Sequence, residues 1–115
     1  REGPAIYALY QNHPVCAGNP SFTPPAAYLS HSDGHCAVIG GKYRQPNGGP
    51  GRFIYSDACT HDLFSLSKIA GEWINTRLGT VDIPGLLTSI GEDMHGTLYL
   101  GNSASRGPIY RLIIE

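Results

Sequence analysis

The most informative part of the sequence is AVIGGKYRQPNGGPGRFIYSDACTHDLFSL, residues 37–66. Its apolar runs, separated by turn-forming residues, predict three short strands, Ala37–Tyr43, Arg52–Asp57 and Leu63–Leu66. The run QPNGGPG between the first two cannot continue a strand and supplies positions that adopt a positive φ. A compact turn containing Cys59 separates the second strand from the third. Three consecutive strands that hydrogen-bond in order make a meander.

The sequence after this stretch repeats the same plan. We expect a fourth strand at Gly71–Leu78, with Trp73, the only tryptophan, packed against the preceding strand. A second unit then follows, with expected strands at Leu87–Glu92, Thr97–Gly101 and Ile109–Ile114. The chain is therefore predicted to be all-β, with about two four-stranded antiparallel meanders of which the last lacks its fourth strand.

The first part of the chain is weakly patterned. Residues 1–25 are expected to be an irregular lead-in loop, because several X-Pro pairs push the backbone out of the helical region. Ala26–Ser30 is predicted as a short strand, and His31–Gly34 as a turn in which Gly34 has a positive φ. This divides the chain into a lead-in at 1–25 and a β region at 26–115.

Successive four-stranded units of about 45 residues are typical of β-propeller blades. A propeller needs about four to eight blades, and this chain supplies fewer than three. Each blade buries both faces against its neighbours, so an isolated pair would expose two large apolar faces. We therefore expect residues 26–115 to be blades of a larger propeller, with the remaining blades or other protein chains as partners.

Composition and charge exclude some classes of partner. The 115 residues are enough for one domain. The net charge is −1, and the basic and acidic residues are scattered along the chain. No basic stripe is present to neutralise phosphates, so nucleic acid is not an expected partner. No apolar run approaches the roughly 20 residues that a membrane-spanning helix needs.

Three cysteines stand at positions 16, 36 and 59. Cys36 and Cys59 would lie in neighbouring positions of one sheet, where a disulfide needs Cα atoms about 4.4–6.8 Å apart. Such a bridge would indicate an oxidising compartment, hence a secreted, extracellular protein. The alternative is two buried free thiols. Cys16 is then unpaired or forms an external disulfide with something beyond this chain.

Several residues invite other chemistry. A zinc site is conceivable because zinc accepts both thiolate and imidazole, but a matching second pair with zinc-ligand spacing is missing. The residues concerned are His31, His35, Cys36, Cys59 and His61. A disulfide flanked by exposed histidines explains them better. A nucleophile–base pair of Cys59 and His61 would be abolished by the same disulfide.

Two further groups have a structural and a functional interpretation. Glu92 and Asp93 could be an acid pair, but adjacent strand residues point to opposite faces, so Asp93 is expected to cap the turn to Gly96. Aromatic residues alternate with smaller ones on the expected strands, and packing between blades explains them better than a platform for sugars. They are Tyr43, Phe53, Tyr55, Phe64, Tyr99 and Tyr110.

Four segments carry a family resemblance, namely HSDGHCAVIGGKYR, GRFIYSDACTHDLFSL, SIGEDMHGTLYL and RGPIYRLI. In order and spacing they resemble the last blades of the six-bladed propeller of soluble quinoprotein glucose/sorbosone dehydrogenases and of the hedgehog-interacting-protein family. The resemblance covers most of residues 26–115, and Arg1-Glu2-Gly3 is similar to the end of a preceding family motif. The segment GGKYR is one residue shorter than the family's usual Gly-Gly-x-x-Tyr-Arg.

The resemblance also implies where the family's quinone cofactor would contact this segment. A lysine would fall near Cys59 and two arginines near Leu86 and Thr88, and none of these positions is basic here. A trianionic quinone would lose charge-assisted contacts of about 1.5–3 kcal/mol each. No catalytic, cofactor-binding or metal-binding residue is therefore expected in this segment.

These observations predict an extracellular β-propeller segment that acts as a binding or structural module within a larger protein or assembly. The alternative is a fragment of a quinone- and calcium-dependent glucose/sorbosone-type sugar dehydrogenase, in which pyrroloquinoline quinone (PQQ) and calcium would be bound by the full-length protein. A third possibility is a closed ring of three two-blade chains. Whether the intact protein is an enzyme is left open by the sequence.

Overall fold

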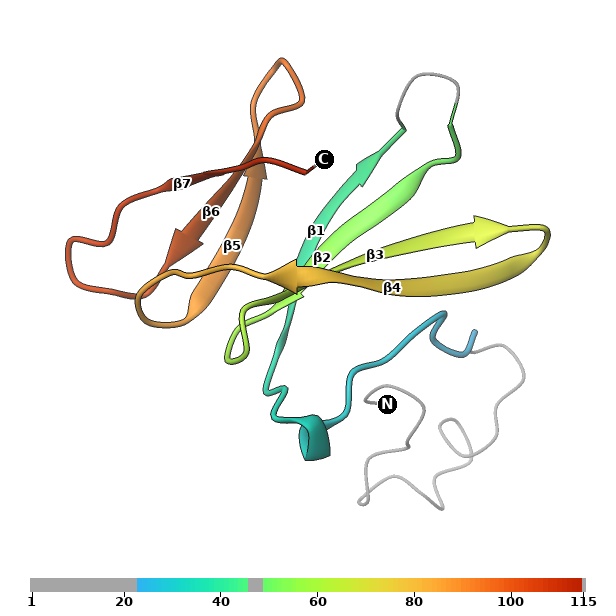
Figure 1. The fold of residues 1–115 in the computed structure, drawn as a ribbon, viewed down its shortest axis with the longest axis horizontal. Coiled ribbons are helices and arrows are strands. Elements are labelled where there is room, and N and C mark those ends of the chain that lie inside the picture. The colour runs from blue at the N-terminus through green and yellow to red at the C-terminus, as the bar shows by residue number, and fades with distance from the viewer. Residues whose placement is uncertain (1–22, 46–48, 115) are drawn as a thin grey trace.

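The strands of this chain form two antiparallel sheets (Figure 1). The computed structural model describes residues 23–45 and 49–114. The first sheet has the order β1-β2-β3-β4 and the second the order β5-β6-β7. The bounds are β1 Val38–Arg44, β2 Arg52–Asp57, β3 Asp62–Ile69, β4 Glu72–Thr80, β5 Leu87–Glu92, β6 Leu98–Asn102 and β7 Tyr110–Leu112. The predicted all-β meanders, with four strands and then three, are confirmed.

The β3–β4 hairpin is longer than the sequence predicts. Its two turn residues, Ala70 and Gly71, have φ angles of 52° and 83°. Two consecutive positive φ values are typical of the tight turn whose twist matches that of paired strands. Pairing therefore begins directly beside the turn, at Ile69 and Glu72, and continues to Asp62 and Thr80. An alanine in the left-handed region carries no clear sequence signal, so the third strand was predicted to end too early, at Leu66, and the fourth to begin within the turn, at Gly71.

Gly41 permits a close approach between β1 and β2. The register of the two strands shifts between Ile39 and Lys42, so Gly40 and Gly41 form a bulge. A Cβ atom on Gly41 would lie 1.5 Å from the carbonyl oxygen of Ile54, whereas one on Gly40 would meet nothing within 4 Å. Position 40 therefore has room for a side chain, whereas the packing against Ile54 requires a glycine at position 41.

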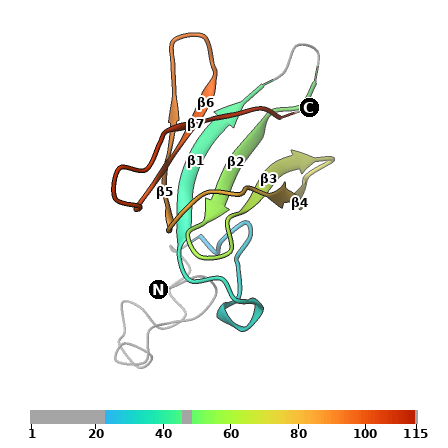
Figure 2. The same ribbon diagram turned by 60° about the vertical axis from the view of Figure 1, so that its left-hand side comes forward.

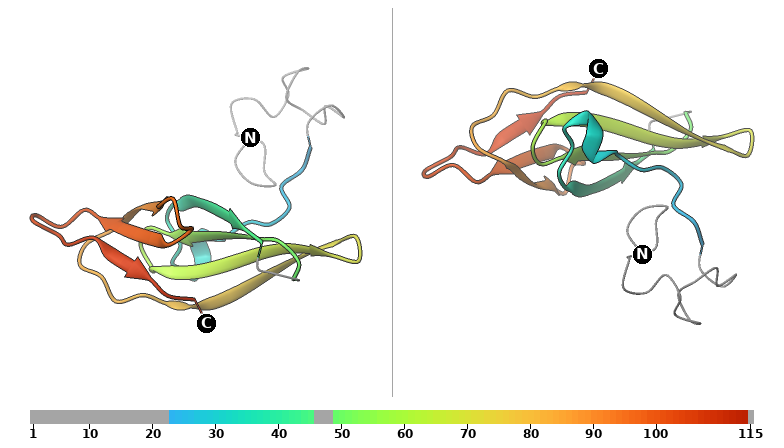
Figure 3. Two further views of the ribbon diagram at one scale, coloured as in Figure 1. Left: turned by 90° about the horizontal axis from the view of Figure 1, so that it is seen from above. Right: turned by 90° about the horizontal axis from the view of Figure 1, so that it is seen from below.

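An apolar core joins the two sheets. Ile54 of β2 packs with residues of the second sheet and of the connection that precedes it, namely Ile83, Leu87, Ile90, Leu98 and Leu100. All six are at most 7 % exposed. β5 lies beside β1, while β4 forms the far edge of the first sheet and leads through residues 81–86 to β5 (Figures 1 and 2). After β7 the chain runs back towards β4 (Figure 3).

The segment before β1 differs from the prediction in part. Ala26–Ser30 does not form a strand. Instead, Ser30 caps a single turn of 3₁₀-helix, η2 (His31–Asp33), by accepting a hydrogen bond from the Ser32 amide. Gly34 ends this turn with a φ of 88°, as predicted. Sequence propensity alone suggested a strand at 26–30, but the backbone there has no partner strand.

Trp73 is only half buried, with 50 % of its surface exposed. Its contact with the preceding strand is through Lys68, its cross-strand partner on β3, whose Nζ lies 5.5 Å from the ring centroid. The predicted contact with β3 is therefore present, but it is a cation–π pair at the surface. No helix in the described part of the chain is long and apolar enough to cross a membrane.

Candidate functional site

The best-defined polar site is built around the buried carboxylate of Asp57, at the end of β2. Its Oδ1 accepts hydrogen bonds from the amides of Cys36 at 2.9 Å and Ala37 at 3.0 Å. Its Oδ2 accepts from the amides of Cys59 and Thr60, both at 2.9 Å, and from the Thr60 hydroxyl at 3.2 Å. One carboxylate thus joins the chain before β1 to the turn after β2.

These donors also set the charge state of Asp57. Burial alone would raise the pKa of the carboxyl, but backbone hydrogen bonds from Thr60, Ala37, Cys36 and Cys59 outweigh it. The pKa of Asp57 therefore lies below its ordinary value, and the group is a buried anion stabilised by backbone amides. The five bonds occupy the acceptor capacity of the carboxylate.

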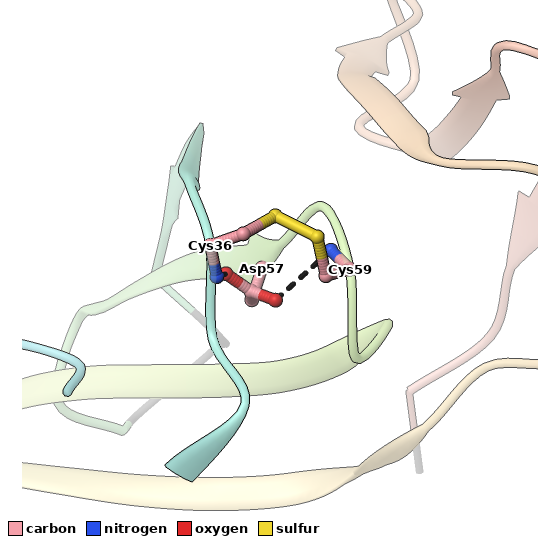
Figure 4. Close-up of side chains that lie close together, drawn as sticks. All are labelled: Cys36, Asp57 and Cys59. Carbon is pink, nitrogen blue, oxygen red and sulfur yellow. Dashed lines mark hydrogen bonds between the residues drawn. A yellow bond between two sulfur atoms is a disulfide. The ribbon is translucent and has the colours of Figure 1, made fainter. Parts of the chain in front are cut away.

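The predicted disulfide between Cys36 and Cys59 is present beside Asp57 (Figure 4). The Cα atoms are 5.7 Å apart, within the range that a disulfide needs. Both cysteines are exposed, so the sulfurs lie at the surface while Asp57 lies beneath them. The disulfide and the carboxylate therefore hold the same two segments together. Cys16 lies outside the described residues.

The turn after β2 also holds the connection to the second sheet. The amide of Leu87 donates to the carbonyl of Ala58 at 3.1 Å, and the amide of Val81 donates to that of His61 at 3.0 Å. The His61 ring places Nε2 2.7 Å from the carbonyl oxygen of Gly85, an arrangement that requires this nitrogen to donate. His61 has a φ of 62°, which turns its backbone towards this connection.

A second polar group surrounds Asp62 at the start of β3. Its Oδ1 accepts from the Thr80 hydroxyl at 2.6 Å and from Arg77 at 2.9 Å. The hydrogen bond from Thr80, with the adjacent Arg77 charge and a bond from Thr60, outweighs the effect of burial and lowers the pKa of Asp62 to about 2. His35 brings Nε2 to 3.4 Å from Oδ2 of the same carboxylate.

The metal-binding hypothesis fails on this geometry. Ligand atoms of Cys36, Asp57 and Cys59 lie within 4.8 Å of one another, but the two sulfurs are bonded together and the carboxylate is saturated by donors. His35 is directed to the Ser30 carbonyl and to Asp62, and His61 to Gly85. The disulfide likewise removes the thiolate that a Cys59–His61 nucleophile pair would need.

Asp93 caps its turn as predicted. Its Oδ1 accepts from the amides of His95 and Thr97, both at 2.9 Å, and Oδ2 accepts from the Tyr99 hydroxyl at 3.1 Å. Gly96 closes the turn by donating to the Asp93 carbonyl, with a φ of 81°. The pKa of Asp93 is lowered, mainly by the hydrogen bond from the Thr97 amide. The interpretation as an acid pair with Glu92 is therefore not supported by the geometry.

Most of the predicted aromatic residues do not lie between the two sheets. Ile54 faces the second sheet, so its neighbours Phe53 and Tyr55 face the other way. There Tyr55 stacks on Phe64 and Phe53, with ring centroids 5.2 and 6.0 Å apart. Tyr110 does pack against the shared core, whereas Tyr43 is 63 % exposed. The aromatic residues of β2 and β3 thus line the outer face of the first sheet.

An apolar pocket of about 380 Å³ lies between the edge of the first sheet and the chain that follows β7. Leucine and isoleucine side chains make up most of its wall. Its lining residues are Leu63, Leu78, Gly79, Thr80, Val81, Leu112, Ile113 and Ile114.

Sequence reasoning missed the polar groups that organise this site. It treated Asp57 only as the end of a strand, although an aspartate at the start of a turn commonly accepts a hydrogen bond from the backbone two residues further on, here from Cys59. The Asp62 group carries no local signal, because Arg77 and Thr80 are brought to it only by the pairing of β3 with β4. Comparisons with protein families, with curated proteins and with solved structures found no match to the chain.

Proposed function

We propose that this chain is a pair of consecutive blades from an extracellular β-propeller that resembles the glucose/sorbosone dehydrogenase and hedgehog-interacting families, and that it acts as a binding or structural module. The observation that carries this proposal is the connection between the sheets. The outer strand β4 leads directly to β5, which lies beside the inner strand β1, and an apolar core joins the two meanders. Blades follow one another in this way around a propeller axis.

Exposed apolar surface supports further blades as partners. On the outer face of the first sheet, Tyr55 and Phe64 are buried, but Tyr43 and Trp73 at its margin are 63 % and 50 % exposed. In the part of the chain that the structure describes, β7 pairs only with β6, and the apolar pocket opens at its end. A neighbouring blade would cover Tyr43 and Trp73, and one added strand would complete the second sheet.

The disulfide supports an extracellular location, because disulfides persist mainly in oxidising compartments. The modular role is supported by how the carboxylates are used. Asp57, Asp62 and Asp93 all accept several hydrogen bonds from turns and neighbouring strands. These groups hold the structure together rather than face an open cleft.

One observation favours the alternative, a quinone- and calcium-dependent sugar dehydrogenase, but the residue types at the same positions oppose it. The three positions at which the resemblance implies cationic ligands lie at one end of the molecule, since the turn containing Cys59 is hydrogen-bonded to the segment around Leu87. They carry cysteine, leucine and threonine instead of lysine and arginine. A triply charged quinone would find no cation at these positions.

The deciding experiment reconstitutes the full-length protein with PQQ and calcium and measures glucose-dependent dye reduction. The proposal predicts no reduction above that of a sample without quinone, and quinone-dependent turnover would overturn the modular role. The mass in native solution tests the propeller separately. A full-length monomer with enough sequence for four or more blades supports it, whereas a monodisperse trimer of this chain would instead show a ring of three two-blade chains.

A further inference from the structure

Three basic side chains share one face and one end of the first sheet. Arg44 and Arg52 are directly opposite each other on β1 and β2, and Lys42 is opposite Ile54. Ile54 belongs to the core between the sheets, and residues two apart on a strand share a face. Lys42, Arg44 and Arg52 are therefore on the face that looks towards the second sheet.

These cations are partly buried, and no described residue forms an ion pair with them. All three side chains are of intermediate exposure. Both ion pairs found among the described residues involve Asp62, at the other end of the sheet. No hydrogen bond from the Lys42, Arg44 or Arg52 side chain to another described residue is present, and the Nε of Arg52 is buried without a partner. A buried, unpaired guanidinium nitrogen costs free energy unless something binds it.

The acidic residues at the same end of the second sheet do not neutralise this cluster. The β1 end and the β5–β6 turn both lie at the upper end in Figures 1 and 2. The Asp93 carboxylate there is engaged by His95, Thr97 and Tyr99. Glu92 is exposed and forms no ion pair within 4.0 Å with a described residue. Among the described residues, the like charges of Arg44 and Arg52 consequently face each other with no ion-pair partner, which is unfavourable on a strand pair.

We propose that Lys42, Arg44 and Arg52 form a binding site for a multivalent oxyanion of the phosphate or sulfate class. Guanidinium groups present paired donors that match the oxygens of such anions, and a lysine adds a point charge. An anion between the two arginines would remove their repulsion and pair the buried Nε of Arg52. The site lies at the end of the sheet opposite the disulfide and does not depend on the propeller assignment.

The test measures binding of inorganic pyrophosphate and of phosphate to the chain by titration calorimetry, and the unfolding temperature with and without each anion. Chloride at matched ionic strength controls for screening. Arg44→Gln is the principal variant, because it removes one charge without removing apolar packing. Lys68→Gln is the matched control, since Lys68 is a basic residue of the same sheet on β3 and lies at the surface beside Trp73.

Pyrophosphate is expected to bind the unmodified chain and the Lys68→Gln variant equally, and the Arg44→Gln variant about tenfold or more weakly. Without anion, Arg44→Gln should raise the unfolding temperature, because the repulsion with Arg52 is gone. Pyrophosphate should then raise it less than in the unmodified chain. An equal gain with chloride, equal binding by both variants, or no binding by the unmodified chain would each overturn the proposal.

Discussion

Replacing Asp57 with asparagine should destabilise the fold strongly, although the two side chains have nearly the same shape. Asp57 accepts two hydrogen bonds on Oδ1 and three on Oδ2. An asparagine places its NH₂ group on one side or the other. In either orientation at least two donors face another donor, and each donor left unsatisfied costs about 1–3 kcal/mol. Because water reaches part of the turn, we expect a loss of about 3 kcal/mol.

The assay is urea unfolding of the oxidised chain followed by circular dichroism. A loss of about 3 kcal/mol would be a large fraction of the roughly 5–15 kcal/mol typical of a domain. Asp82→Asn is the matched control, because it removes the same charge at an exposed position and should change stability by less than about 0.5 kcal/mol. If Asp57→Asn costs less than about 1 kcal/mol, the carboxylate is not what holds the turn, and the disulfide alone would have to do so.

Three further outcomes are expected. The pKa of Asp62 in the folded chain is about 2, below the ordinary carboxyl value, so the stabilisation by its carboxylate is complete above about pH 4 and is lost as the pH falls towards 2. Asp62→Asn should flatten this part of a curve of unfolding free energy against pH, and an unchanged curve would contradict the lowered pKa. Alkylation without reductant should label neither Cys36 nor Cys59, and removing their bridge should cost about 3 kcal/mol; labelling of both would exclude the disulfide. Gly41→Ala should destabilise the chain by more than about 2 kcal/mol because its Cβ would strike the Ile54 carbonyl, while Gly40→Ala should be tolerated; similar denaturation midpoints would refute the bulge geometry.

Local patterns were enough to predict most strands. β1, β2 and β5 agree with their predicted ranges to within a residue or so, because apolar runs there are bounded by glycine, proline or aspartate. The strand at 26–30 was wrong, since short apolar segments form strands only where a partner edge exists. β7 is shorter than predicted, at three residues, and the chain after it turns to the pocket beside β4.

Only the cysteine pair of the candidate site could be predicted, because the residue type itself indicates a disulfide. The cysteines were paired correctly because neighbouring strands bring their positions within bonding distance. The central role of Asp57 was not foreseen, since its donors come from residues 20 and 21 positions earlier as well as from its own turn. The cation cluster likewise depends on the β1–β2 register, which the bulge at Gly40 and Gly41 shifts by one position.

The amino-acid sequence was enough to predict the secondary structure class, the order of the two meanders, the disulfide and the cap at Asp93. These features depend on residues that are close along the chain or on one adjacent hairpin, so local propensity and turn chemistry are enough. By contrast, the packed structure was needed to show which aromatic residues face the second sheet, and which carboxylates and cations find partners among the described residues. Those outcomes depend on strand register and on sheet packing, where a shift of one residue moves every side chain to the opposite face.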